Sequence, residues 1–266
     1  LFGTLQRYRT TARPHGGATP IQPELAFVMS NLAGLSHSSS VVLDPYAGTG
    51  SLLLPAAHWG LSPYGGDVQL GATNGELVVG RHGGVQVRSQ RDHCGEGAPG
   101  SGVSANFRHL GLPPPQLVQA NIFRSPWTPR GVYDAVVADP PYGTREQQVG
   151  TESAIRDTRI GPSGTSQCYV SDYTGAEMVA LVFAMVEPLL KLAAAALKPG
   201  GRLVYLFPTF STQASVGYWD PGAFGGEVAL KESQLPGHVA LRFESVSHQP
   251  CVSRTMARNV VVMVRR

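Results

Sequence analysis

An apolar run that ends in an acidic residue and a glycine turn constrains the fold of this chain more than any other segment. Residues 41–44 read Val-Val-Leu-Asp, and the turn Gly48-Thr49-Gly50 follows closely. Residues 51–59 are largely apolar and compatible with a helix. A strand, a glycine turn and a helix in this order open a nucleotide-binding βαβ unit, in which glycines let the backbone approach a ligand. The segment therefore predicts a parallel α/β sheet with a ligand beside the turn.

The turn does not fit the common phosphate-binding loops. A dinucleotide-binding GxGxxG pattern needs a glycine three residues after Gly50, where Leu53 stands, and the GK[ST] of a P-loop is also missing. An acidic strand end with a short glycine turn suits a ligand that lacks phosphates and carries a positively charged amino acid tail. S-adenosyl-L-methionine is such a ligand. The candidate cofactor-binding residues of this segment are Asp44, Tyr46, Ala47, Gly48, Thr49 and Gly50.

A second motif, Asp139-Pro140-Pro141-Tyr142, follows the apolar residues 135–138. The carboxylate of Asp139 and the carbonyl of Pro140 can both accept hydrogen bonds from one amino group, and Tyr142 can stack on the ring that carries this group. Taken alone, the tetrapeptide fits a rigid turn after a strand equally well. Its position downstream of the glycine turn favours a site for a planar amine, with these four residues as the catalytic candidates.

Hydrophobic periodicity predicts one doubly wound, Rossmann-like α/β sheet. The last two strands are joined by too few residues for a crossover helix, so we expect an antiparallel last strand. Residues 73–79 are expected to be partly helical. Strands are predicted over residues 41–44, 62–67, 116–120, 133–139, 202–207, 242–247 and 259–264, and helices over 21–32, 51–59, 103–112 and 176–197.

In this arrangement the carboxyl ends of the first four strands carry Asp44, Asp67, Asn121 and Asp139. Ligands bind at this edge of open α/β sheets. Asp67 can accept both ribose hydroxyls of a nucleoside, although an exposed Asp in a glycine turn is the alternative interpretation. The four side chains are therefore expected to surround one cleft.

Three further segments are expected to lie outside the compact sheet. Residues 1–19 are basic and polar and form a linker or N-terminal arm, with a solvated tail slightly preferred to a substrate contact. Residues 80–104 lose periodicity and form a mobile insertion. Residues 143–174 form a substrate loop, whose arginines are candidates for RNA phosphate contacts: Arg145, Arg156 and Arg159.

Composition limits the possible partners. A chain of 266 residues with 42% hydrophobic content is long enough for one sizeable core. The formal charge of +3 permits an anionic partner without requiring one. The cysteines are far apart in the sequence, at Cys94, Cys168 and Cys251. Neither they nor His82 and His93 show the spacing of metal ligands. We therefore expect free thiols in the cytoplasm, no metal site and no membrane span.

The paired motifs Asp-Pro-Tyr-Ala-Gly-Thr-Gly and Asp-Pro-Pro-Tyr-Gly resemble those of methyltransferases that act on exocyclic amines of nucleic-acid bases. Residues 139–146, Asp-Pro-Pro-Tyr-Gly-Thr-Arg-Glu, narrow this resemblance. Together with residues 20–31, 44–60, 106–112, 200–205 and 253–256, they resemble the catalytic domain of the tRNA (guanine-10-N2)-methyltransferase family, one of the THUMP-containing RNA amino-methyltransferases. The likeness spans most of the chain, with a methyltransferase domain expected over residues 20–266.

The resemblance implies a class I S-adenosylmethionine-dependent methyltransferase that methylates N2 of guanine 10 in tRNA. Related methyltransferases carry Asp at position 121 to accept from the adenine amino group, whereas this chain has Asn121. The amide oxygen can still accept this bond, without charge assistance, so we expect weaker cofactor binding. Ile122 is expected to offer an apolar face to the adenine.

Two alternatives remain at this stage. A DNA adenine-N6 or cytosine-N4 methyltransferase would use the same tetrapeptide, and a non-catalytic nucleic-acid-binding subunit could keep the fold without turnover. The resemblance also implies an RNA-binding THUMP region before the catalytic domain, and the start at Leu1 suggests a fragment. In eukaryotic members it further implies a small zinc-binding activator protein as a partner beside tRNA.

Overall fold

The computed structural model describes residues 5–15, 21–35, 40–68, 77–79, 85–87, 102–127, 129–141, 175–210, 232–253 and 256–266. The helices are α2 (Pro23–Leu32), α3 (Leu54–His58), α4 (Val103–His109) and α5 (Gly175–Ala196), and short 3₁₀ helices span Thr10–Ala12, Ile122–Arg124 and Glu232–Gln234. The strands are β1 (Val41–Asp44), β2 (Ser62–Asp67), β3 (Leu77–Val79), β4 (Val85–Val87), β5 (Gln116–Gln119), β6 (Tyr133–Ala138), β7 (Leu197–Phe210), β8 (Leu241–Ser253) and β9 (Met256–Arg265).

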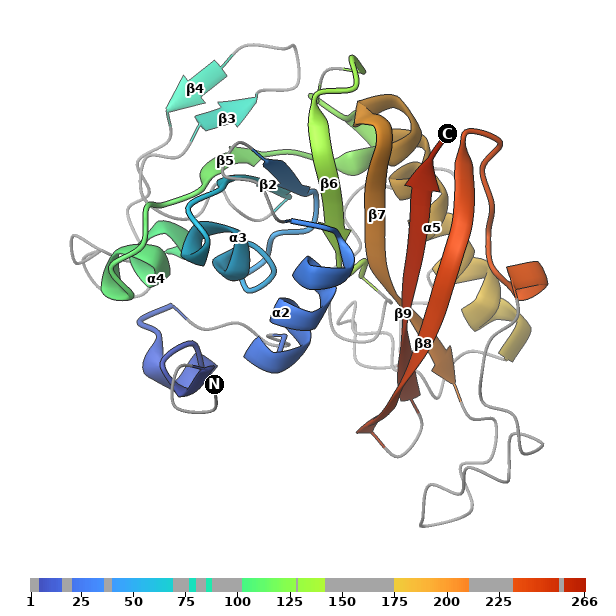
Figure 1. The fold of residues 1–266 in the computed structure, drawn as a ribbon, viewed down its shortest axis with the longest axis horizontal. Coiled ribbons are helices and arrows are strands. Elements are labelled where there is room, and N and C mark those ends of the chain that lie inside the picture. The colour runs from blue at the N-terminus through green and yellow to red at the C-terminus, as the bar shows by residue number, and fades with distance from the viewer. Residues whose placement is uncertain are drawn as a thin grey trace, which may run out of the picture.

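All the described strands form one sheet in the order β4-β3-β5-β2-β1-β6-β7-β9-β8 (Figure 1). Strands β5, β2, β1, β6 and β7 pair in parallel, whereas β9 lies antiparallel between β7 and β8. The predicted seven-stranded doubly wound sheet with an antiparallel last strand is therefore confirmed. This topology is the one expected from the resemblance to class I methyltransferases.

The hairpin β3–β4 adds two strands to the predicted sheet. β3 pairs in parallel with β5 and antiparallel with β4. The prediction of helix is wrong for residues 77–79, because Leu-Val-Val is a short apolar, partly β-branched run that can extend the sheet edge. The remaining residues of that expected helix, 73–76, lie outside the described ranges. Of the expected insertion, residues 85–87 and 102–104 are described.

The two sides of the sheet bury different sets of side chains, because successive residues of a strand face opposite sides. On one side, Val42, Ala135 and Val137 pack with Met29 of α2 and with α3. On the other, Leu43 and Val136 pack with the apolar face of α5. Figure 1 shows α2 in front of the sheet and α5 behind β7 and β9. The sheet is thus covered on both sides, as a doubly wound fold requires.

Two residues of the N-terminal segment, Tyr8 and Arg13, are buried, whereas most of its other described residues are exposed. Tyr8 is 1% exposed and its ring contacts Phe27 and His58 at centroid distances of 5.5 and 5.6 Å. The Tyr8 hydroxyl lies 2.8 Å from Nδ1 of His58. Arg13 is also buried. The preferred expectation of a solvated tail is therefore wrong for residues 8 and 13, because the Tyr8 ring packs on α2 and α3 and Arg13 donates a hydrogen bond to Ser51.

Within the described ranges, no helix has the length and apolar character needed to cross a membrane. Among the described residues, no three or more His, Cys, Asp or Glu side chains lie close enough together to hold a metal ion. His82, His93, Cys94 and Cys168 lie outside those ranges.

Asp134 links three strands at the amino end of β6, which gives a test of the fold. Its Oδ2 accepts a hydrogen bond from the Val41 backbone N–H at 2.8 Å, and its Oδ1 accepts from Lys198 Nζ at 2.7 Å. We predict that Asp134→Ala lowers the free energy of unfolding by about 1–3 kcal/mol, because it leaves a strand N–H without an acceptor. Lys198→Met removes only a partly exposed ion pair and should cost about 1 kcal/mol or less. Urea denaturation measures both, and an equal loss in the two variants would contradict this ranking.

Candidate functional site

Parallel pairing brings four strand ends to one edge of the sheet. Asp44 of β1 lies opposite Gly65 of β2, and Asp67 at the end of β2 lies opposite Gln119 at the end of β5. The backbone N–H of Ala120 continues this pairing by donating to the Asp67 carbonyl at 3.0 Å. β6 pairs on the other side of β1 and ends directly before Asp139. The predicted placement of Asp44, Asp67, Asn121 and Asp139 at one edge is therefore confirmed, whereas their binding roles stay predictions.

The glycine turn after β1 is closed by backbone hydrogen bonds. Gly50 N–H donates to the Ala47 carbonyl at 2.6 Å, and Ala47 N–H donates to the Gly66 carbonyl of β2 at 2.9 Å. Gly48 and Gly50 have φ of +49° and +79°, a region that favours glycine. A Cβ on Gly50 would lie 2.7 Å from Cγ1 of Val103, in α4. Glycine is thus needed at position 50 both for its conformation and for the close approach of α4.

Asp44 is the most buried carboxylate of the edge, with 1% of its surface exposed. Its Oδ1 accepts a hydrogen bond from the Tyr46 backbone N–H at 3.0 Å. Burial raises the pKa of Asp44 well above its usual range, the Tyr46 hydrogen bond opposes this rise, and the negative charges of Asp67 and Asp139 add to it. The charges of Asp67 and Asp139 therefore reach Asp44 at this edge, which favours a cationic ligand there.

Tyr46 is anchored away from the turn by its hydroxyl, which donates to the Met185 carbonyl of α5 at 3.0 Å. Burial and the nearby charges of Asp44 and Asp67 raise the pKa of this hydroxyl. The side chain thus ties β1 to α5. Tyr46 shapes the candidate cofactor site through its backbone N–H, which orients Asp44, and not through its side chain.

Asp67 and Asn121 already hold backbone groups at the neighbouring strand ends. Oδ2 of Asp67 accepts from the Gly48 N–H at 3.0 Å, which joins the β2 end to the glycine turn. Oδ1 of Asn121 accepts from the Phe123 N–H at 2.9 Å and caps the short 3₁₀ helix Ile122–Arg124. The expected hydrogen bond from the adenine amino group to the Asn121 amide oxygen stays a prediction. Ile122 is 7% exposed and packs in the core with α5, which leaves little of its surface for a ligand.

The motif Asp139-Pro140-Pro141 begins immediately after β6. The Asp139 side chain is 17% exposed, Pro140 is buried and Pro141 is half-buried. Tyr142 and the expected substrate loop, including Arg145, Arg156 and Arg159, lie outside the described residues. The structure thus shows a largely shielded carboxylate at Asp139, where the motif predicts an acceptor for the planar amine.

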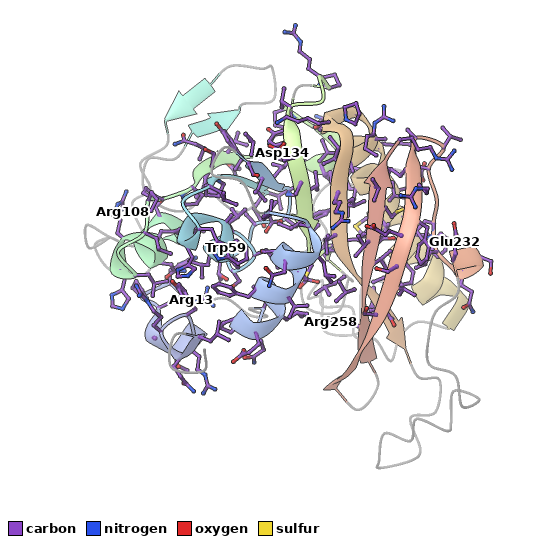
Figure 2. The ribbon with its side chains drawn as sticks, viewed as in Figure 1. Arg13, Trp59, Arg108, Asp134, Glu232 and Arg258 are labelled. Carbon is purple, nitrogen blue, oxygen red and sulfur yellow. The ribbon has the colours of Figure 1, made fainter. Side chains whose placement is uncertain are left out.

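Arg258 is a site residue that the sequence did not reveal. Its Nη1 lies 3.5 Å from Oδ2 of Asp139, and the side chain is 11% exposed. Figure 2 shows Arg258 and Asp134 toward opposite ends of the sheet. Arg258 stands 119 residues after Asp139 and reaches it because β9 lies beside β7, which pairs with β6. No short-range signal in the sequence links Arg258 to Asp139, because only the order of the strands brings the two residues together.

Asn106 joins the N-terminal segment to the glycine turn. This fully buried side chain accepts from the His15 N–H at 2.9 Å and donates to the His15 and Thr49 carbonyls at 3.0 and 3.2 Å. Arg13 Nη1 donates to Oγ of Ser51 at 3.0 Å, and this oxygen lies 3.1 Å from Oγ1 of Thr49. Residues far apart in sequence therefore surround the turn.

Comparison with known proteins finds methyltransferases that are similar to this chain. A family model described as "RMKL-like, methyltransferase domain" matches residues 10–97. The tRNA (guanine(10)-N(2))-methyltransferases TRMT11 of Dictyostelium discoideum and Bos taurus are 28% and 27% identical to this chain over 264 and 262 residues, and each match covers 97% of it. The chain spans 43% and 50% of the length of these two relatives.

Solved structures with a similar arrangement are distant in sequence. The geranyl diphosphate C-methyltransferase of Streptomyces coelicolor A3(2) is 9% identical, with a TM-score of 0.46 over 92% of this chain and 76% of that one. The tRNA (m1A58) methyltransferase TrmI of Aquifex aeolicus is 10% identical, with a TM-score of 0.42 over 94% of this chain and 71% of that one.

The matches to the curated relatives extend over nearly the whole chain, including the strand ends, the glycine turn and the Asp-Pro-Pro-Tyr motif. They confirm the resemblance inferred from the sequence: the chain is similar to the methyltransferase region of the tRNA (guanine-10-N2)-methyltransferase family.

Proposed function

We propose that this chain transfers a methyl group from S-adenosyl-L-methionine to the exocyclic N2 of guanine 10 in tRNA. The observation that carries the proposal is the convergence of Asp44, Asp67 and Asp139 at one sheet edge, around a glycine turn. The similarity to tRNA guanine methyltransferases supports the choice of base and nucleic acid.

The residues at the edge fit the cofactor by charge and by hydrogen-bonding type. Asp44, buried and surrounded by negative charge, suits the side of the cofactor that carries the ammonium group. Asp67 offers carboxylate oxygens to ribose hydroxyls, and the Asn121 side chain offers hydrogen-bonding groups to the adenine. Gly48, Thr49 and Gly50 present backbone with no bulky side chain in the way. When bound, S-adenosylmethionine supplies an electrophilic methyl group.

Asp139 and Pro140 provide the acceptors for the target amine. The lone pair of the guanine N2 is delocalised into the ring, so the amine is a weak nucleophile. Hydrogen bonds from its two hydrogens to the Asp139 carboxylate and the Pro140 carbonyl favour a geometry in which the lone pair points at the methyl carbon. As the N–C bond forms and the S–C bond breaks, N2 loses one proton, which Asp139 is placed to accept.

Arg258 supports this use of Asp139. A guanidinium beside a carboxylate stabilises its charged form and restricts its orientation. Since the Asp139 side chain is only 17% exposed, a neighbouring cation offsets part of the cost of removing its charge from water. Arg258 thus acts as a positioning residue in the proposal.

The proposed substrate is tRNA, so the chain must bind RNA and admit a base from its stack. Extruding a base costs a few kcal/mol, and stacking on Tyr142 would offset part of this cost. A cytoplasmic location, expected from the dispersed cysteines, and a small zinc-binding activator protein, implied by the family resemblance, complete the proposal.

The role of Asp139 can be tested by nucleoside analysis. We predict that the parent chain, in excess over unmodified tRNA and with isotope-labelled S-adenosylmethionine, forms N2-methylguanosine in a single turnover. Asp139→Ala should lower the rate by at least about 100-fold, because it removes an oriented acceptor for the reacting amine. Asp134→Asn, at the opposite end of the same strand, is the matched control and should keep the parent rate.

Other outcomes discriminate among the alternatives. Label in N6-methyladenosine or N4-methylcytosine would reject the guanine assignment, and preference for a DNA substrate would favour the DNA methyltransferase alternative. Binding of S-adenosylmethionine without methylation of any base would support the non-catalytic alternative. Unchanged activity of Asp139→Ala would reject the proposed role of that residue.

The buried carboxylate of Asp44 predicts a pH dependence of stability in the absence of ligand. Because the folded protein raises the pKa of Asp44, it holds the proton more tightly than the unfolded chain does. The resulting stabilisation is fully present below the unfolded pKa of about 4 and is lost as the pH rises through the folded pKa. Asp44→Asn cannot ionise, so its stability should exceed that of the parent increasingly as the pH rises from 4 toward 7.

Urea denaturation of both proteins at a series of pH values measures this difference. A constant difference between Asp44→Asn and the parent across the series would show that Asp44 ionises at its ordinary pH in the folded chain.

A further inference from the structure

Arg13 is a buried cation whose surroundings do not complete its hydrogen bonds. The residue is 7% exposed, and its Nη1 donates to Oγ of Ser51 at 3.0 Å. Nε and Nη2 are buried too, and neither meets an acceptor among the residues that the structure describes. Buried donors of a charged group without acceptors are costly and uncommon in folded proteins. Burial also lowers the pKa of the Arg13 guanidinium, which reflects the same unfavourable environment.

The guanidinium is held against the glycine turn from several directions. Ser51, its partner, directly follows Gly50, and the same oxygen lies 3.1 Å from Oγ1 of Thr49. Asn106 binds both the backbone of His15, two residues beyond Arg13, and the Thr49 carbonyl. Figure 2 shows Arg13 below Trp59, on the side of the molecule where α3 and α4 lie. The segment is therefore anchored on the turn independently of the Arg13 contact.

The two donors without acceptors form one geometric unit. Nε–H and one N–H of Nη2 point to the same side of the planar guanidinium, and this side matches the two oxygens of a carboxylate. Within the described ranges, none of the ion pairs involves Arg13. The carboxylates of the site lie at the strand ends instead: Asp44 and Asp67 are the last residues of β1 and β2, and Asp139 directly follows β6. The anion that Arg13 suits is thus a ligand group rather than one of these side chains.

We propose that Arg13 binds the α-carboxylate of the amino acid tail of S-adenosylmethionine through Nε and Nη2. The inference rests on the proposed function for the identity of the ligand. The two charged groups of the zwitterionic tail then face protein groups of opposite charge. Arg13, beside the glycine turn, binds the carboxylate, and the acidic strand ends face the ammonium. Arg13 thereby recognises the part of the cofactor that the acidic residues would repel.

Calorimetric titration with two ligands tests the assignment. S-adenosylhomocysteine carries the carboxylate, and its decarboxylated analogue keeps the ammonium and the nucleoside but lacks the carboxylate. We expect the parent chain to bind S-adenosylhomocysteine about 10- to 100-fold more tightly than the analogue, which is the range for a charge-assisted hydrogen-bonded pair. Arg13→Met should lose this discrimination and bind the two ligands with similar affinity.

Two matched variants complete the experiment. Arg13→Lys keeps the charge without the two-pronged geometry and should recover part of the discrimination. Arg108→Met removes an exposed arginine of α4 and should bind both ligands as the parent does.

Equal affinity of the parent for the two ligands would overturn the inference without needing any variant, even if Arg13→Met failed to fold. An equal loss for both ligands in Arg13→Met would assign Arg13 a structural role in holding the turn, and would likewise overturn it. If the parent bound neither ligand while giving a cooperative unfolding transition, the proposed function would fail and the inference would fail with it.

Discussion

The parallel pairing of β1 between β2 and β6 is the constraint on which the rest of the structure depends. It places the carboxyl ends of three strands side by side, and each strand delivers an acidic residue there. Burial, together with the nearby charges of Asp67 and Asp139, disfavours the ionised form of Asp44 and raises its pKa. Hydrophobic packing of the same strands on α2 and α5 supplies the stability that maintains the arrangement. A site that concentrates negative charge at this cost suits a cationic ligand.

The arginines of the site balance this charge from outside the parallel sheet. Arg258 comes from the antiparallel strand β9 and lies against Asp139, and Arg13 comes from the N-terminal segment and lies against the glycine turn. Neither is delivered by the βαβ units that form the acidic edge. The proposed chemistry therefore needs the antiparallel end of the sheet and the first fifteen residues as much as it needs the motifs themselves.

Short-range sequence patterns correctly predicted those elements that depend on neighbouring residues. Residues 62–67 were expected as a strand and form β2, and the glycine turn, the Asp-Pro-Pro motif and the antiparallel last strand all have short-range signals. The length of β7 and β8 was underestimated, because residues outside the apolar run still pair with β9.

Residues 77–79 were misassigned to a helix because pairing with β5 is a long-range interaction. The burial of Tyr8 and Arg13 was missed for the same reason, since their partners lie about 40 to 50 residues away. Arg258 was beyond sequence reasoning, because only the order of the strands brings it to Asp139.

The central claim is that the cofactor lies across the ends of β1, β2 and β5, against the glycine turn. Amide hydrogen exchange with and without S-adenosylhomocysteine tests it most directly, because exchange reports protection residue by residue along the backbone. The account predicts ligand-dependent protection of residues 44–50, 67 and 119–123, with little change at the opposite end of the sheet around Asp134. Protection confined to that opposite end, or binding that leaves residues 44–50 unprotected, would contradict it.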